Sequence, residues 1–290
     1  MTSMIKNIFS APLRYAAAVM VFGLSSCYDK FDPDTYRPEF TISGFTAADQ
    51  IGRDNLVAYW SFDDNLNNEL SGSAASNTET SFVNGFKGRA VNFNATTESY
   101  LLYEPEASIT GMTSFTMSMW INPKFVDTNA DGTNDGIIGF VNLSNPTGFW
   151  GNIDWFIENG SNQEASKIVF HVTTANGETW VNVNGVKDLF DRWSNHTVTY
   201  DEATSTFSYF IDGSRLVTAT AEWSGPIQFT GSGPMVFGTV QFQTDPSIGC
   251  CGKQDWASYL TGFIDEVRIY NAALSPEEIN ALVVLQGKGK

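Results

Sequence analysis

The stretch FVDTNADGTNDGI (125–137) places oxygen-bearing side chains at a spacing that could bind a cation. Asp127, Asn129 and Asp131 alternate, a glycine follows, and Asp135 lies two residues before an apolar run. Alternating carboxylate and amide oxygens ahead of a glycine turn open the calcium loop of helix-loop-helix proteins. We therefore take Asp127, Asn129, Asp131 and Asp135 as candidate ligands of a loop calcium ion.

The same stretch departs from that calcium loop in two ways. The twelfth position, which should hold a bidentate glutamate, is Ile138. The flanking segments FTMSMWINP and GIIGFV have the pattern of strands and not of helices. The stretch is therefore not a helix-loop-helix hand. Two interpretations stay open: a weak calcium loop between two strands, or a polar hairpin loop built from Asn, Asp and Gly turn formers.

Two other stretches combine an aromatic side chain with polar neighbours, as sugar-binding sites do. Aromatic faces stack on sugar rings, and carboxylates and amides bond the sugar hydroxyls. In NPTGFWGNIDW, Trp150 lies between glycines and is followed by Asn152 and Asp154; in GCCGKQDWASY, Gln254 precedes Trp256. We take these five residues as candidate ligand-binding residues. The alternative is that both tryptophans fill the core or cover a sheet edge.

The two adjacent cysteines, Cys250 and Cys251, point to structure and not to catalysis. A metal site would need more ligands nearby, and the chain holds only two imidazoles, His171 and His196. We expect both histidines to be satisfied within the sheets. For the cysteines we predict either a disulfide between the neighbours, which closes a small strained ring, or two buried thiols.

The first 27 residues have the composition of a targeting segment. Lys6 and Arg14 precede an apolar run of about ten residues, which is too short for a membrane span of roughly 20. The run ends in Leu-Ser-Ser-Cys27, which resembles the lipobox of bacterial lipoprotein signal peptides. We predict a signal peptide over residues 1–26 and a lipid on Cys27. The alternative is a short membrane anchor or a buried segment.

Residues 27–54 are polar, contain two prolines and show little periodicity, so we predict a flexible tether after the lipidated cysteine. Its acids Asp29, Asp32 and Asp34 follow closely on Cys27, which resembles the surface-export signal of Bacteroidetes lipoproteins. We expect a lipid-anchored protein of the outer membrane that faces the cell exterior.

The charge balance limits the partners of the chain. With 16 basic and 32 acidic residues the formal net charge is −16. Cleavage before Cys27 would remove two basic residues and no acid, which leaves 14 against 32 and a net charge of −18. This argues against nucleic acid and against docking on an anionic lipid surface through protein charge. It is compatible with neutral glycans and with cations.

From residue 55 onward, short apolar runs recur every ten or so residues. Many alternate apolar with polar residues, as in Phe115-Thr-Met117-Ser-Met119, and Asn-Gly or Asp-Gly pairs separate several of them. This pattern predicts an all-β, two-sheet antiparallel sandwich. One short C-terminal helix follows, because Ser275-Pro-Glu-Glu278 has the features of a capping box. We place the sandwich at 55–282 and a frayed tail at 283–290.

Five segments together resemble the bacterial laminin-G-like domain of the concanavalin A-like lectin/glucanase superfamily: LVAYWSFDDN, GFKGRAVNFN, FTMSMWINP, HTVTYDEATSTFSYFIDGSRL and GFIDEVRIYNAALSPEEI. They occur in the family's order and cover roughly residues 55 to 282. The resemblance implies a jelly-roll-like sandwich, a structural calcium ion in many members, and often carbohydrate or extracellular-ligand binding. Fold and function are separate inferences, because the family is functionally broad.

The resemblance also identifies a second calcium candidate. Asp63 follows the first strand and Asp265 begins the last, and these two strands are neighbours in a sandwich of this kind. We expect both to hold a structural calcium ion. The alternative is that Asp265 bonds the backbone N–H groups of a turn without metal.

Glucanases of this superfamily carry carboxylates in the pattern Glu-x-Asp-x-x-Glu on one strand, so that they point into one cleft. No such run occurs here, and nucleophile-elbow and zinc-helix patterns are also absent. We therefore predict a non-enzyme without catalytic residues, a surface lipoprotein that binds a polysaccharide or glycan noncovalently and assembles with other glycan-uptake proteins. The alternatives are an adhesion module for a protein or matrix ligand and, less favoured, a glycoside hydrolase.

Overall fold

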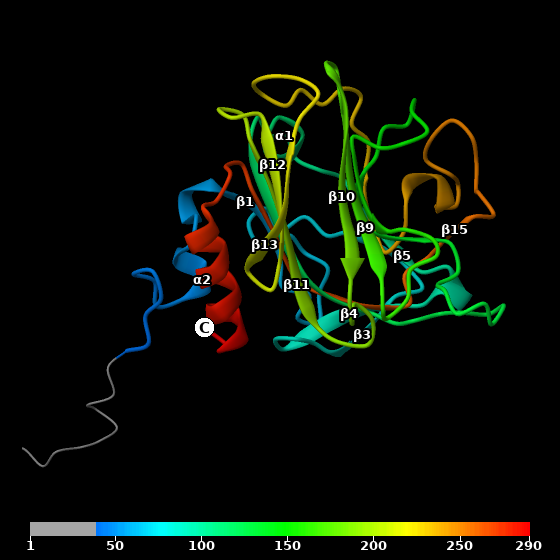
Figure 1. The fold of residues 1–290 in the computed structure, drawn as a ribbon, viewed down its shortest axis with the longest axis horizontal. Helices are drawn as coiled ribbons and strands as arrows, with labels where there is room; N and C mark the ends of the chain where they lie inside the picture. Colours follow the sequence, from blue (N-terminus) through cyan, green and yellow to red (C-terminus); the bar gives the residue numbers. More distant parts are fainter. Residues whose placement is uncertain (1–38) are drawn as a thin grey trace, which may run out of the picture. The chain divides into compact units, whose positions relative to one another are not determined.

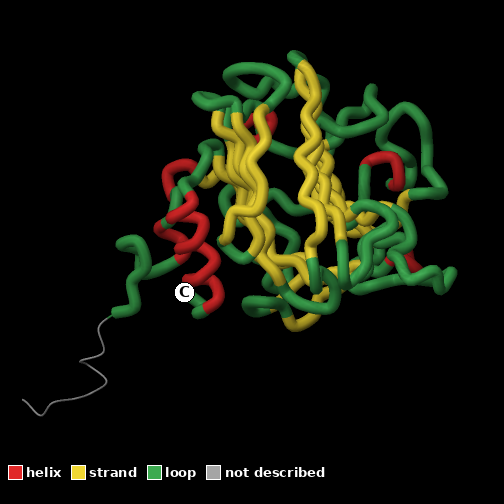
Figure 2. The backbone as a smooth tube through the Cα atoms, in the orientation of Figure 1, coloured by secondary structure: helices red, strands yellow, loops and turns green. Residues whose placement is uncertain are grey.

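The computed structural model of the chain describes residues 39–290, and Phe40–Lys290 form one unit. Two eight-stranded sheets are packed face to face (Figures 1 and 2). All strand pairs are antiparallel except the pair of β15 with β7. The predicted all-β sandwich is thereby confirmed. The predicted signal peptide, Cys27 and the first part of the tether lie outside the described residues.

We name the two sheets after a central strand of each. The β6 sheet runs in the order β13 (Ser214–Thr220), β12 (Thr206–Ile211), β11 (Ser194–Asp201), β6 (Phe115–Pro123), β16 (Gly262–Tyr270), β4 (Arg89–Phe93) and β3 (Ser81–Asn84), with β1 (Leu56–Trp60) also on β16. The β8 sheet runs in the order β10 (Gly177–Val186), β9 (Ser166–Thr174), β8 (Ile153–Ile157), β7 (Ile137–Leu143), β14 (Met235–Phe237), β5 (Tyr100–Tyr103) and β2 (Ser76–Thr78), with β15 (Ala257–Ser258) also on β7.

Alternation along each strand separates the core from the outer faces. In β8, Ile153, Trp155 and Ile157 point into the core between the sheets, while Asp154 and Phe156 point away from it. Turn chemistry fixes the register of the hairpins. The β12–β13 turn is Asp212-Gly213, both with positive φ (49° and 77°), as a two-residue hairpin loop of matching twist requires.

Helix α2 (Pro276–Gly287) covers the outer face of the β6 sheet (Figure 1). Its N-terminus has the predicted capping box: Glu278 N–H donates to Ser275 Oγ (3.2 Å), and Ser275 N–H donates to Glu278 Oε2 (2.8 Å). The helix continues to Gly287, with Leu285 fully buried, so the tail predicted from residue 283 is wrong at its start. The remaining helices are short: α1 (Ala107–Thr110), η1 (Ala48–Gln50), η2 (Arg53–Asn55), η3 (Ala95–Thr97) and η4 (Gln241–Gln243).

The predicted tether is also too long at its C-terminal end. Ala48 and Ile51 are 1% exposed and pack with α2, and Ile42 and Phe45 pack against the same cluster. These four apolar residues recur every three positions, and the apolar side of α2 needs a cover. The folded unit therefore begins before the predicted boundary at residue 55. Within residues 39–290, no helix is long and apolar enough to cross a membrane.

Candidate functional site

The outer face of the β8 sheet carries a row of polar and aromatic side chains across four strands. Cross-strand register places Asn142 (β7) opposite Asp154 (β8), Asp154 opposite His171 (β9), and His171 opposite Trp180 (β10). Directly opposed side chains of one sheet face lie close enough to interact. The row is therefore set by strand pairing, although its members are up to 38 residues apart in sequence.

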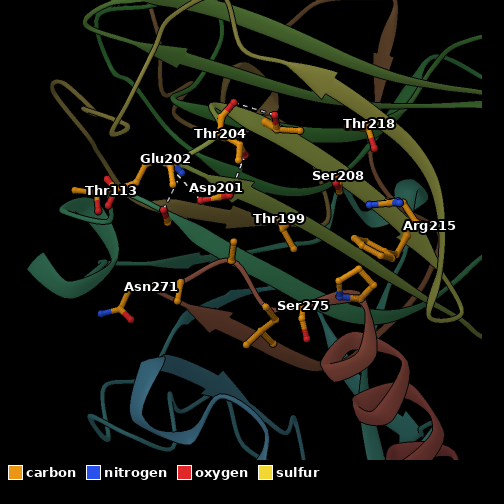
Figure 3. A pocket seen from close by; sticks show the side chains of 18 residues that line it. Thr113, Thr199, Asp201, Glu202, Thr204, Ser208, Arg215, Thr218, Asn271 and Ser275 are labelled. Carbon is orange, nitrogen blue, oxygen red and sulfur yellow. Dashed lines mark hydrogen bonds between the residues drawn. The ribbon is translucent and has the colours of Figure 1, made fainter. Parts of the chain in front are cut away.

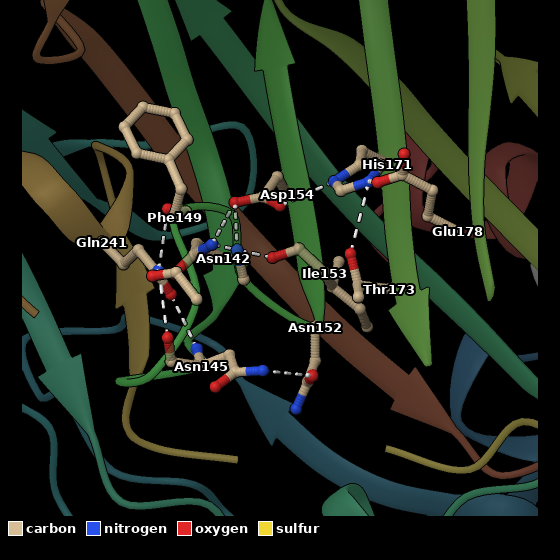
Figure 4. A network of polar contacts seen from close by, with 12 residues as sticks. Asn142, Asn145, Phe149, Asn152, Ile153, Asp154, His171, Thr173, Glu178 and Gln241 are labelled. Carbon is tan, nitrogen blue, oxygen red and sulfur yellow. Dashed lines mark hydrogen bonds and ion pairs between the residues drawn. The ribbon is translucent and has the colours of Figure 1, made fainter. Parts of the chain in front are cut away.

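His171 lies between two carboxylates in this row (Figure 4). Its Nδ1 is 2.9 Å from Asp154 Oδ2 and its Nε2 is 3.1 Å from Glu178 Oε2. Asp154 and His171 are fully buried, whereas the Glu178 side chain is 54% exposed. Burial raises the pKa of the Asp154 carboxyl, although hydrogen bonds from His171, Gly151 and Asn142 oppose this. The prediction that His171 is satisfied within its sheet is confirmed.

Two tryptophans pack on this histidine. The indole of Trp180 stacks on the imidazole of His171 with ring centroids 3.8 Å apart, and the edge of Trp150 approaches the same ring at 5.9 Å. Trp150 and Trp180 are 5.4 Å apart and nearly perpendicular. Trp180 remains 37% exposed. The buried polar row therefore supports an aromatic surface that solvent reaches.

Gln241 holds the loop that carries Trp150 (Figure 4). Its buried amide donates to the backbone carbonyls of Asn145 (3.1 Å), Gly148 (3.0 Å) and Phe149 (2.9 Å), and its Oε1 accepts from Asn145 N–H (2.7 Å). Four hydrogen bonds from one buried side chain fix the loop over the sheet. Phe149 then stacks on Phe242 at 4.7 Å, which extends the aromatic cluster.

Trp256 brings the third indole to this surface. It lies 6.2 Å from Trp150 and 6.0 Å from Phe149, and it is 41% exposed. The parallel pairing of β15 with β7 fixes its position, because Ile137 N–H donates to the Trp256 carbonyl (3.2 Å) where the Asp/Asn-rich insert ends. We call Trp150, Trp180 and Trp256 the tryptophan surface.

The insert and Trp256 line a common pocket of about 370 Å³. Its lining includes Asn129, Asp131, Thr133, Asp135, Asn159 and Asp255. Two of the two candidate regions identified in the sequence, the insert and the aromatic stretches, are thus brought together by the tertiary structure.

The oxygens of the insert are used within the loop. Asp127 Oδ2 accepts from Gly132 N–H (2.8 Å), Asn129 Oδ1 from Asp131 N–H (2.9 Å), and Asp131 Oδ1 from Thr133 N–H (2.9 Å). Such side-chain-to-backbone bonds are typical of polar turns. Asp135 Oδ2 accepts from Thr128 N–H (2.8 Å), which closes the loop. The structure thus forms the turn of one interpretation, and calcium binding by this loop stays a prediction.

Two of the candidate ligand-binding residues are corrected by their burial. Asn152 and Asp154 are 0% exposed. Asn152 Nδ2 donates to Thr230 O (3.2 Å) and Ser232 Oγ (2.8 Å), so it anchors a neighbouring loop. Neither side chain offers an atom to a ligand at the surface, because strand alternation and the loop above place both beneath the tryptophans. Gln254 is half-buried, and its amide donates to Gly252 O (3.0 Å).

Trp180 is a surface residue that the sequence analysis missed. The segment GETWVNVN alternates, and it places Trp180 on the same strand face as Glu178 and Asn182. A tryptophan on the polar face of an alternating strand was the available signal, because a large aromatic residue is expected on the apolar face.

Cys250 and Cys251 form the predicted disulfide, and both are exposed. Cys250 N–H donates to the carbonyl of Gly148 (3.3 Å), two residues before Trp150. The disulfide therefore lies beside the loop that carries the central tryptophan. His196 is fully buried, with Nδ1 2.8 Å from the Tyr209 hydroxyl, which confirms its predicted structural role.

Asp63 and Asp265 converge on one turn, at residues 85–89. Arg89 N–H donates to Asp63 Oδ1 (2.6 Å), and Lys87 N–H donates to Asp265 Oδ2 (2.9 Å). The turn is tight, since a Cβ on Gly85 would lie 2.5 Å from Asp265 Oδ2. The alternative weighed for Asp265, a carboxylate that bonds turn N–H groups, is thus present.

Asp265 nevertheless keeps a feature of a cation ligand. It is 0% exposed, and its Oδ1 is buried without a hydrogen-bond partner. Burial raises the pKa of Asp265 to about 8, against the hydrogen bond from Lys87. Buried carboxylate oxygens without a partner are costly, and a calcium ion would satisfy this one. Within residues 39–290 no group of three or more His, Cys, Asp or Glu side chains gathers at one point, so backbone carbonyls would have to complete the coordination.

A larger pocket of about 620 Å³ lies on the other sheet, between β11–β13 and residues 271–276 (Figure 3). Hydroxyl and charged side chains line it, including Thr199, Asp201, Ser208 and Arg215, and Phe210 is its one aromatic residue. Phe210 is only 1% exposed. The pocket therefore lacks the exposed aromatic face that distinguishes the tryptophan surface.

Comparisons with known proteins agree with this architecture. The family model Laminin_G_3, described as "Concanavalin A-like lectin/glucanases superfamily", matches residues 95–280. No curated protein sequence matches the chain.

Solved structures with the same fold include three toxin structures. The botulinum neurotoxin type C structure has a TM-score of 0.58 at 16% identity and covers 81% of this chain and 52% of its own. The binding domain of Paraclostridial Mosquitocidal Protein 1 (0.57, 17%, 80% and 52%) and that of botulinum neurotoxin DC in complex with SialylT (0.57, 14%, 80% and 52%) are similar to it in the same way. The chain spans about half the length of these structures. Because the family match covers more than half of its residues, the chain belongs to the concanavalin A-like lectin/glucanases superfamily as a laminin-G-like domain.

Proposed function

We propose that the tryptophan surface binds a carbohydrate noncovalently. The observation that carries this proposal is the clustering of three indoles from separate chain segments, two of them more than one-third exposed. Large exposed aromatic residues are costly to leave in water and mark binding surfaces. Flat aromatic faces beside hydroxyl and amide groups suit sugar rings, which have apolar faces and polar edges.

The mechanism is recognition by preformed groups. The strand register and the Gln241 contacts hold Trp150 and Trp180 in place before a ligand arrives. A preorganised surface loses little conformational entropy on binding. Stacking on the indoles would supply affinity, and the amide and hydroxyl groups of Asn129, Thr133 and Asn159 in the adjoining pocket would bond sugar hydroxyls.

A structural calcium ion is part of the proposal. Asp265 and Asp63, with backbone carbonyls of the 85–89 turn, would hold it. The ion would supply positive charge to a buried carboxylate and stiffen the turn that joins the first and last strands. It would have no role in bond breaking.

The proposed setting is the cell surface. Cys27 as a lipid anchor in the outer membrane, an outward-facing domain and assembly with other glycan-uptake proteins would place the tryptophan surface where polysaccharide is captured. Botulinum neurotoxin type C depends for cell entry on interaction with two ganglioside molecules. At 16% identity that likeness bears on the fold and leaves the ligand of this chain to experiment.

The test is retention of the protein on a panel of insoluble polysaccharides. We expect retention by the wild type on at least one of them and loss with Trp256→Ala. Leu216→Ala is the matched control, because Leu216 is 51% exposed on β13 of the other sheet. No retention on any glycan, together with binding to protein matrices, would replace the proposal by adhesion. Release of reducing sugar that stops on substitution of an acidic residue would replace it by hydrolysis.

A further inference from the structure

The two exposed indoles of the tryptophan surface are separate platforms. Trp150 lies between them, 5.4 Å from Trp180 and 6.2 Å from Trp256, so the two outer rings are no more than about 12 Å apart. Their planes make angles of 86° and 54° with that of Trp150. A single pyranose ring covers about one indole face and cannot stack on both outer rings. Full use of the surface therefore requires a chain of sugar units.

The surroundings of the platforms are acidic. Glu178 is 54% exposed beside Trp180, and Asp255 precedes Trp256 and lines the adjoining pocket with Asp131 and Asp135. No basic side chain lines that pocket. Uronate, sialate or sulfate groups would therefore meet charges of their own sign.

The two lysines nearest in sequence to these elements do not offset this charge. Lys253 lies 2.5 Å from Glu98, and Lys167 lies 3.3 Å from Glu158. Each ammonium group is thus paired with a carboxylate outside the tryptophan surface. The adjoining pocket offers neutral amides and hydroxyls, from Asn129, Thr133 and Asn159, and these can donate to or accept from sugar hydroxyls.

We infer that the site takes an uncharged oligosaccharide chain that spans Trp180 and Trp256 as two subsites, and that it discriminates against acidic glycans. This inference rests on the proposed function of the tryptophan surface. It adds the length and the charge class of the ligand.

Calorimetry with the full chain tests the length. The probes are neutral oligosaccharides from the monosaccharide to the hexasaccharide, prepared from the polysaccharide that retains the protein. We expect affinity to rise by roughly tenfold or more once the chain reaches both outer indoles, a gain typical of one additional aromatic contact. Trp180→Ala and Trp256→Ala should each remove that gain and leave the affinity for the shortest ligands within about threefold of its value in the subsite that remains.

The charge class is tested with uronic acid oligomers of matched length. We expect them to bind at least tenfold more weakly at low salt, with the difference shrinking at high salt and in Asp255→Asn. A monosaccharide that binds as tightly as the hexasaccharide, or acidic oligomers that bind as well as neutral ones, would overturn this inference and leave glycan binding intact. Loss of glycan binding altogether in the wild type would overturn the proposed function instead.

Discussion

The imidazole of His171 lies almost parallel to the indole of Trp180, with ring centroids 3.8 Å apart and an interplanar angle of 23°. His171 is fully buried and is held on both ring nitrogens by Asp154 and Glu178. The buried histidine therefore acts as the base on which the exposed indole is positioned. A polar row inside the sheet and an aromatic surface outside it form one structural unit.

Removing this base should weaken ligand binding although His171 touches no ligand. We expect His171→Ala to reduce glycan affinity by roughly three- to tenfold, because Trp180 loses its stacking partner and becomes mobile. Titration calorimetry measures the affinity, and near-ultraviolet circular dichroism reports the order of the indole. His196→Gln, a change of the other buried histidine, should leave affinity unchanged. Unaltered affinity in His171→Ala would contradict the positioning role.

The exposed and the buried tryptophans should differ in their effect on stability. Trp60 is 0% exposed and packs edge-on against Tyr103 at 4.8 Å, so Trp60→Ala should cost about 3 to 5 kcal/mol of the free energy of unfolding. Trp256 is 41% exposed, so Trp256→Ala should cost less than about 1 kcal/mol while it weakens glycan binding. Urea unfolding measures both. A cost for Trp256→Ala equal to that for Trp60→Ala would mean that its role is structural.

Calcium should stabilise the domain through Asp265. An ion present at about 100 times its Kd adds about 2.7 kcal/mol, which raises Tm by roughly 5 to 10 °C in a domain of this size. We expect this rise in the wild type on replacing chelator with calcium, and its loss in Asp265→Asn. Scanning fluorimetry in both buffers is sufficient. If Asp265→Asn retains the calcium-dependent rise, the ion lies elsewhere.

The insert is tested by a separate pair of substitutions. Asp127→Ala combined with Asp131→Ala removes two carboxylates from the loop and leaves the 85–89 turn untouched. If the loop is a second, weaker calcium site, calorimetry will show one binding event fewer than in the wild type. Equal binding isotherms for the two proteins would mean that the insert is a polar turn. In either case we expect Tm in chelator to fall by less than 5 °C, because the loop is exposed.

The buried His196 should make the domain sensitive to acid. Burial, with the nearby charge of Arg192 adding to it, lowers the pKa of His196 to about 3, whereas a histidine in the unfolded chain titrates at about 6.5. Between these values the unfolded state binds one proton more than the folded state. The contribution is therefore complete above a pH of about 6.5 and is lost as the pH falls toward 3.

His196→Gln should flatten this dependence by about one proton, or roughly 4 kcal/mol across the window. Urea unfolding at several pH values between 7 and 4 measures the slope. Trp256→Ala is the control and should keep the slope of the wild type. A slope for His196→Gln that matches the wild type would show that other groups set the acid sensitivity.

Local sequence patterns predicted much of the fold. Strand alternation depends on a two-residue period, and the Asp212-Gly213 turn and the Ser275 cap depend on the residues themselves, so these features can be read without tertiary information. Segments whose partner lies far away were predicted less well. Ile42 to Ile51 lack the length of a regular helix, and only the presence of α2 makes their apolar spacing meaningful.

The candidate site shows the same division. The sequence by itself determined which residues have the chemistry to bind a sugar or a cation: the indoles of Trp150 and Trp256, and the carboxylates of the insert. It could not determine exposure. Asn152 and Asp154 have the right chemistry, but strand register and the loop above bury them.

Only the tertiary structure decided that three tryptophans from different strands and loops meet on one face. Trp180 reaches that face because β10 pairs with β9 opposite His171, and Trp256 because β15 pairs with β7 at the end of the insert. These pairings are non-local, and their register depends on the packing of the whole sandwich. The chemistry of the surface is written in the sequence, and its assembly is a property of the folded sheets.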